Sequence, residues 1–176
     1  MPSVWIHGTC SAGLFEITDP EGPVNQLKPF RYFLRVRYGE CDQQGVVYNA
    51  RYGEYVDLAC SEFLRVALAP RDIFAGGFEV QVVKLLIEWT APARCDDTLE
   101  ISVATKAMGN TSFTLGFELR RLGETSPLAT AETINVHVDA THWTKTPLPS
   151  EIRVRLEAGA GDQYVDHAGV FSPKRA

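Results

Sequence analysis

One segment of this chain has helical periodicity, whereas the other patterned segments alternate as strands do. Between residues 49 and 68, apolar side chains recur at helical spacing and polar side chains fall off that stripe. Asn49 is a candidate N-cap, and Pro70 follows the end of the pattern. The sequence therefore predicts a long amphipathic helix from Asn49 or Ala50 to Leu68. Its apolar stripe comprises Tyr52, Tyr55, Val56, Ala59, Phe63, Val66 and Ala67, and its polar side includes Arg51, Glu54, Asp57 and Arg65.

Strand patterns flank this helix. One precedes it, at residues 30–38, and four follow it, at residues 78–89, 98–105, 112–119 and 129–138. Gly109 and Asn110 mark a hairpin turn, and a short helix is expected from Pro149 to about Leu156. An antiparallel sheet of about five strands against one helix is a two-layer α+β arrangement. Because such a sheet leaves edges and a face uncovered, we expect the chain to form an oligomer.

The chain divides into three parts by pattern. Residues 1–29 form an N-terminal extension that is hard to interpret, with short apolar runs at residues 4–6 and 14–17 that could pair as a hairpin. Residues 30–158 carry the regular patterns and make up the folded domain. Residues 159–176 are glycine-rich and mixed, which favours a C-terminal tail at the surface.

Composition excludes several functions. The formal net charge of -5 gives no support for a nucleic-acid partner. No apolar run reaches the roughly 18 residues that a membrane span requires, and the N-terminus does not resemble a signal peptide, so we expect a cytoplasmic protein. The cysteines and histidines show no metal-ligand spacing, which predicts no metal site.

The segment from Tyr38 to Tyr52 carries the residues suited to chemistry. It places Asp42 in a polar loop just before the helix, where unpaired backbone N–H groups and the helix dipole favour negative charge. Gly45 allows a tight turn, so the carboxylate and the helix start could face the same small volume. A thioester carbonyl needs a donor for its oxygen and a nucleophile or base beside its carbon. This loop could supply both.

The run Asp42-x-x-Gly45-Val46-Val47-Tyr48-x-x-x-Tyr52 resembles the signature of the 4-hydroxybenzoyl-CoA thioesterase family of hotdog-fold proteins. Pro92, Asp97 and the strand pair ending at Leu119 also resemble that family, and the likeness covers roughly residues 31–139. The resemblance implies a hotdog fold and hydrolysis of an acyl-CoA or acyl-carrier-protein thioester, with no cofactor beyond the CoA of the substrate.

The same resemblance assigns roles to residues. Asp42 would act as nucleophile or general base, and the backbone N–H near Asn49 would polarise the carbonyl. Many members carry a histidine where Asn49 stands, so its expected role is confined to the backbone. Gly45, Tyr48 and Tyr52 would contact substrate, although Tyr52 also lies on the apolar stripe. Family members place the site at a subunit interface and commonly form tetramers built from dimers.

Other interpretations remain open. A hotdog dehydratase or hydratase would need a histidine in this loop, yet none occurs between His7 and His137. A non-catalytic acyl-thioester-binding protein is a second alternative. Cys41 has no nearby histidine to activate it as a nucleophile and is interpreted as a packing residue. Acyl contacts are expected from the helix and from residues 78–89, and the candidate cations for CoA phosphates are Lys106, Arg120, Arg121 and Lys145.

Overall fold

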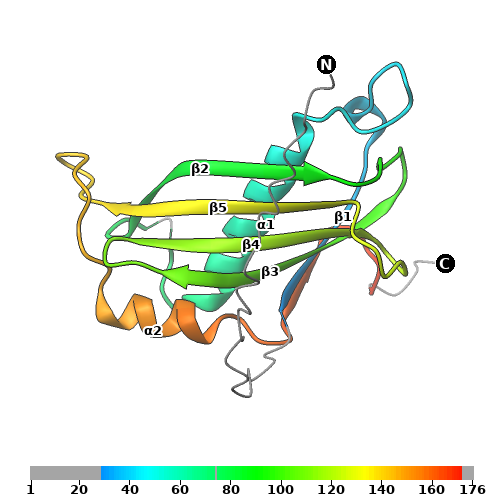
Figure 1. Cartoon of the computed structure of the whole chain (residues 1–176). Coiled ribbons are helices and arrows are strands. Elements are labelled where there is room, and N and C mark those ends of the chain that lie inside the picture. The colour runs from blue at the N-terminus through cyan, green and yellow to red at the C-terminus, as the bar shows by residue number, and fades with distance from the viewer. Residues whose placement is uncertain (1–28, 74, 172–176) are drawn as a thin grey trace, which may run out of the picture.

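A six-stranded sheet and one long helix make up most of the computed structural model, which describes residues 29–73 and 75–171 (Figure 1). The strands follow the order β2-β5-β4-β3-β1-β6 across the sheet, and all neighbouring pairs are antiparallel except β1 and β6. The elements are β1 (Phe30–Arg35), the 3-10 turn η1 (Tyr38–Glu40), α1 (Arg51–Ala67), β2 (Glu79–Trp89), β3 (Thr98–Met108), β4 (Ser112–Arg121), β5 (Ala129–Val138), α2 (Ser150–Ala158) and β6 (Tyr164–Asp166).

Helix α1 lies against one face of the sheet, as Figure 1 shows. Its buried face matches the apolar stripe expected from the sequence, with Val66 partly buried. Phe63 is 1% exposed and meets Phe30 of β1 edge to face, with ring centroids 6.0 Å apart. The alternating strands β3 and β4 contribute Ile101 and Leu115, both fully buried, to the same core. The predicted α+β architecture with one long helix is therefore confirmed.

The sheet differs from the sequence-based expectation at its β1 end. The strand expected to reach residue 38 ends at Arg35, and Tyr38 begins the 3-10 turn. The expected C-terminal tail contributes β6, which pairs in parallel with β1 and makes the sheet mixed and six-stranded. Phe171 anchors this segment, because its ring lies 5.2 Å from that of Phe33. The hairpin expected within residues 1–29 lies outside the described residues.

Strand β2 forms the other edge of the sheet, and many of its apolar side chains are exposed to solvent. Five of them are more than two-fifths exposed, and Val83 reaches 62%. The register of β2 on β5 shifts at Val83, where a bulge interrupts the ladder. An apolar edge strand of eleven residues is a surface on which another strand can pair. The five side chains are Val82, Val83, Leu85, Leu86 and Trp89.

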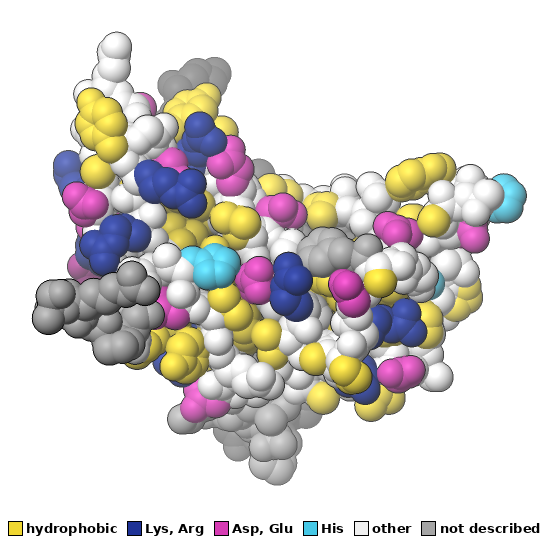
Figure 2. Space-filling view, turned by 180° about the vertical axis from the view of Figure 1, so that it is seen from behind, with side chains coloured by type: hydrophobic (Ala, Val, Ile, Leu, Met, Phe, Trp, Pro, Cys, Tyr) yellow, Lys and Arg dark blue, Asp and Glu magenta, His cyan; other side chains and the backbone are white. Residues whose placement is uncertain are grey.

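The face opposite to that of Figure 1 shows basic and acidic side chains intermingled, with apolar side chains in a hollow between them (Figure 2). Exposed residues of α1, such as Glu54 and Leu58, belong to the uncovered side of the helix. Within the described ranges, no helix combines the length and apolarity needed to cross a membrane.

Candidate active site

A tight hairpin leads from η1 into α1 and carries Asp42. Cys41 and Val47 pair across it as an antiparallel bridge. The Asp42 N–H donates to the Val46 carbonyl over 2.9 Å, and the Gly45 N–H donates to the Asp42 carbonyl over 3.0 Å. Gly45 has a φ of +74°, a left-handed conformation that closes the turn and that L side chains rarely adopt. The turn predicted at Gly45 is therefore present.

Replacing Gly45 by alanine should destabilise the hairpin. An added Cβ would meet no atom within 4 Å, so the cost comes from the left-handed backbone alone and is about 1–2 kcal/mol in the free energy of unfolding. Gly39→Ala is the matched control, because Gly39 has equal space and no positive φ. Urea unfolding followed by circular dichroism measures both variants. Equal stability of the two variants would contradict the strain argument.

The Asp42 carboxylate is exposed and only partly engaged. Its Oδ1 accepts a hydrogen bond from the Gln44 N–H over 2.8 Å, which orients the side chain. Its Oδ2 makes no hydrogen bond within the described part of the chain. One carboxylate oxygen therefore holds the turn, while the other is available to a substrate or a water molecule.

The start of α1 offers backbone N–H groups next to this hairpin. The N-cap is Ala50, without a side-chain cap, so the prediction of Asn49 as N-cap is wrong. Helical hydrogen bonding begins when the Tyr48 carbonyl accepts from Arg51 N–H over 2.8 Å. Among residues 29–73 and 75–171, the N–H groups of Asn49 and Ala50 have no hydrogen-bond acceptor. Such unpaired donors at a helix start favour an oxyanion.

A shallow cavity of about 310 Å³ opens beside this helix start. Asn49 and Tyr52 line it from the α1 side, and Trp89 closes it from the end of β2, with its ring 5.9 Å from that of Tyr52. Asp42 and Tyr48 do not line it within a single chain, and Tyr48 is 54% exposed. The full lining consists of Val47, Asn49, Tyr52, Trp89, Thr90, Ala91 and Pro92.

The loop after β2 is hydrogen-bonded both to the hairpin and to α1. The Val47 N–H donates to the Ala93 carbonyl over 2.9 Å, and the Ala93 N–H donates to the Tyr52 hydroxyl over 3.2 Å. Tyr52 is 2% exposed, so it both lines the cavity and anchors the loop. Ala93 could not be recognised from its residue type, because backbone atoms make its contribution.

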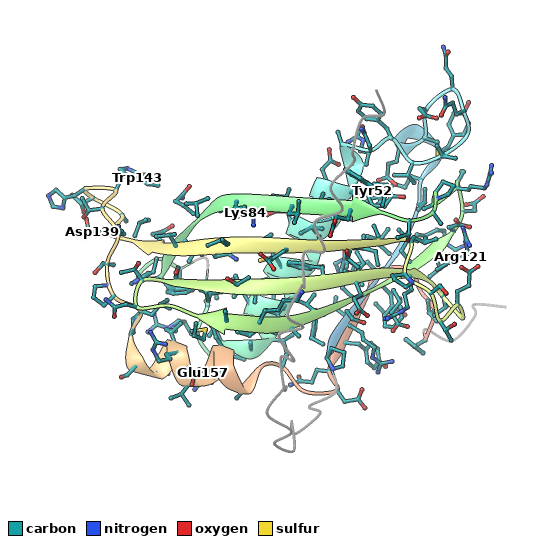
Figure 3. All side chains as sticks on the ribbon, in the orientation of Figure 1. Tyr52, Lys84, Arg121, Asp139, Trp143 and Glu157 are labelled. Atoms are coloured by element: carbon teal, nitrogen blue, oxygen red, sulfur yellow. The ribbon has the colours of Figure 1, made fainter. Side chains whose placement is uncertain are left out.

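Arg121 at the end of β4 holds the same loop. Its guanidinium contacts the Asp97 carboxylate at 3.0 Å and donates to the Pro92 carbonyl over 3.2 Å. A further ion pair joins it to Glu124. These contacts give Pro92 and Asp97 a structural role. They also occupy the guanidinium of Arg121, which was one candidate for binding the CoA phosphates, with partners inside the protein. Figure 3 shows Arg121 and Tyr52 at the same end of the molecule, far from Asp139 and Trp143.

Cys41 is half-buried beside Asp42, and its sulfur lies 3.9 Å from the Arg37 carbonyl. Burial, followed by the proximity of Cys95, Asp42 and Glu40, raises the pKa of the Cys41 thiol. A raised thiol pKa leaves less thiolate for nucleophilic attack. The structure thus favours the interpretation of Cys41 as a packing residue.

A sheet wrapped around one helix, with a carboxylate and unpaired amides where that helix begins, defines a hotdog-fold protein suited to acyl-group chemistry. The family model of the thioesterase-like superfamily matches residues 36–156. Acyl-CoA thioester hydrolase YbgC from Escherichia coli is 36% identical over 125 residues, which cover 70% of this chain and 92% of YbgC. A 1,4-dihydroxy-2-naphthoyl-CoA hydrolase from Synechococcus elongatus is 28% identical over 141 residues, covering 76% and 99% of the two chains.

Solved structures agree with these relatives. Slr0204, a 1,4-dihydroxy-2-naphthoyl-CoA thioesterase from Synechocystis, superposes with a TM-score of 0.65 at 25% identity, covering 72% of this chain and 94% of Slr0204. A mutant 4-hydroxybenzoyl-CoA thioesterase in complex with 4-hydroxybenzoyl-CoA gives a TM-score of 0.65 at 19% identity, covering 72% and 96%, which supports the fold alone. This chain belongs to the thioesterase-like superfamily. The hotdog fold and the expectation of a thioesterase-type enzyme are confirmed.

Proposed function

We propose that this chain hydrolyses an acyl-CoA thioester to the free acid and CoA, with Asp42 as the reacting carboxylate. One observation carries the proposal. The hairpin pairs Cys41 with Val47, so Asp42 lies about one strand spacing, roughly 5 Å, from Val46, which is three residues before Asn49. A half-engaged carboxylate and the unpaired N–H groups of the helix start therefore belong to the same short hairpin and its junction with α1.

The chemistry follows from these groups and needs only water as co-reactant. The N–H groups of Asn49 and Ala50 would hold the thioester oxygen as it becomes anionic. With Asp42 as general base, its carboxylate takes a proton from water, the resulting hydroxide adds to the carbonyl carbon, and collapse expels the CoA thiolate. With Asp42 as nucleophile, its carboxylate adds to the carbonyl carbon and expels the CoA thiolate, and water then cleaves the resulting acyl-carboxylate anhydride to the free acid and the restored carboxylate. Both routes release acid and CoA thiol.

We further propose that the enzyme acts as a homo-oligomer whose basic unit is a dimer formed through β2. The cavity beside Asn49 borders the end of this apolar edge strand at Trp89. A second copy pairing along β2 would cover the exposed valine and leucine side chains and close the open side of the cavity. Closure would also keep bulk solvent away from the reacting carbonyl while leaving the attacking water in place, which strengthens the hydrogen bonds to its oxygen.

The acyl group would extend from the cavity along the seam between α1 and β2. Gly53 lies against Leu85 there, because a Cβ on Gly53 would be 3.6 Å from the Leu85 side chain. Farther along the seam a second cavity of about 210 Å³ lies between the two elements, with the buried Asn135 in its wall. The cavity of about 310 Å³ beside Asn49 would have room for an acyl group with a small aryl or short aliphatic body. Several relatives are named for hydroxyaryl-CoA substrates, and YbgC for acyl-CoA thioesters in general.

Purified protein should release free thiol from at least one class in a panel of short, branched, long and aromatic acyl-CoA thioesters, followed with a thiol-reactive chromophore. Matching acyl-carrier-protein thioesters distinguish the two carriers. Tight thioester binding without hydrolysis would replace the proposal with a binding function. Formation of an enoyl thioester from a 3-hydroxyacyl-CoA would replace it with a hydratase or dehydratase.

A further inference from the structure

Glu40 forms hydrogen bonds both with helix α1 and with the hairpin that carries Asp42. It ends the 3-10 turn two residues before Asp42, and its carboxyl side chain is only 13% exposed. Buried carboxylates are costly unless hydrogen bonds satisfy them. Glu40 meets that requirement through partners on both sides of the hairpin.

The side chain of Glu40 joins η1 to α1. Its Oε2 accepts hydrogen bonds from the Tyr55 hydroxyl over 2.8 Å and from the Arg37 N–H over 2.7 Å. Tyr55 is 2% exposed on the inner face of α1. Burial and the hydrogen bond to Glu40 raise the pKa of Tyr55, so its hydroxyl stays protonated and continues to donate.

The backbone of Glu40 joins the two ends of the hairpin. Its carbonyl accepts from the Tyr48 N–H over 2.9 Å, and its N–H donates to the Arg37 carbonyl over 3.0 Å. Tyr48 directly precedes Asn49, whose N–H is one of the unpaired donors at the helix start. Glu40 therefore lies two residues before Asp42 in the chain, and it is hydrogen-bonded to Tyr48, which directly precedes the unpaired amides of Asn49 and Ala50.

We propose that Glu40 is a positioning residue that, through Tyr55, sets the distance between the Asp42 carboxylate and the amides of Asn49 and Ala50. This inference rests on the proposed function. Glu40 itself does not contact the reacting groups. It lines a separate cavity of about 350 Å³ with Arg37, Leu58 and His167, and that cavity shares no lining residue with the one beside Asn49.

Glu40→Ala should lower kcat on the order of 10- to 100-fold and leave KM nearly unchanged, because misplacing a catalytic group by about 1 Å costs up to roughly that factor. Glu40→Gln should retain more activity than Glu40→Ala, since its amide oxygen can still accept from Arg37 N–H. Glu118→Gln is the control, because Glu118 is an exposed, ion-paired carboxylate on β4. It should keep the wild-type kcat.

A double-mutant cycle with Tyr55→Phe separates positioning from general destabilisation. If the two residues act as one unit, Glu40→Ala and Tyr55→Phe together should lower kcat little more than Glu40→Ala alone. Hydrogen exchange provides a readout without substrate, since the Arg37 and Tyr48 amides should exchange faster in Glu40→Ala while the amides of β3 and β4 stay protected.

Three results would overturn the inference: wild-type kcat in Glu40→Ala, additive effects in the cycle, or loss of protection throughout the sheet. Asp42→Asn is assayed in parallel. If it is inactive while Glu40→Ala is fully active, the positioning role fails and the proposed function stands. If Asp42→Asn is fully active, the proposed function itself fails.

Discussion

Asp42→Asn should lower kcat on the order of 10²- to 10⁴-fold, the range expected when a positioned acid–base group is removed. The amide is neutral and can neither take a proton from water nor add to a carbonyl carbon. The substitution should nevertheless preserve the hairpin, because the Asn side-chain oxygen can accept the Gln44 N–H as Oδ1 of Asp42 does. Single-turnover thiol release from the best acyl-CoA substrate gives the rate, and thermal unfolding verifies that the fold is intact.

A matched control for this change is Asp139→Asn. Asp139 occupies a similar exposed turn and accepts backbone N–H groups from Thr141 and His142, but it lies at the opposite end of the molecule (Figure 3). The hydrogen bonds from His142 lower the pKa of Asp139, which keeps its carboxylate charged at neutral pH. Asp139→Asn should keep wild-type turnover. Equal turnover in both variants would refute the assignment of Asp42.

The long helix and the succession of strands along the chain could be predicted from the sequence because each depends on local periodicity. The stripe from Tyr52 to Ala67 fixes which face of α1 is buried, and the turn at Gly109 and Asn110 fixes the β3–β4 hairpin. The motif around Asp42 and Gly45 similarly placed Asp42 in a loop just before the helix. These features require no knowledge of distant partners.

The features that escaped prediction depend on contacts between residues far apart in the chain. Strand β6 has three residues and is stabilised by its pairing with β1, so its own pattern is too short to recognise. The ion pair between Arg121 and Asp97 and the hydrogen bond from Tyr55 to Glu40 join residue types that are common on protein surfaces, so their identity alone does not reveal the contact. The assignments of Gly45, Tyr48 and Tyr52 to substrate, the tetramer and the cytoplasmic location stay predictions.

Lysine substitutions on the edge strand should convert the protein into a monomer with little activity. Val83 is 62% exposed and Leu86 is 44% exposed, so Val83→Lys together with Leu86→Lys should disturb the isolated fold little. Charged edge residues are a common natural device against strand pairing. In a symmetric β2–β2 contact each substitution would also occur twice and place like charges close together.

Val154→Lys on α2 provides the matched control, since Val154 is 63% exposed and lies away from the β2 edge. Light scattering coupled to size-exclusion chromatography measures the mass of each variant, and thiol release measures activity on the same samples. We expect an oligomer for the wild type and for Val154→Lys, and a monomer for the double variant. A monomeric but fully active double variant would mean that one chain closes its own site, since Asp42, the helix-start amides and the cavity beside Trp89 would then suffice without a partner strand.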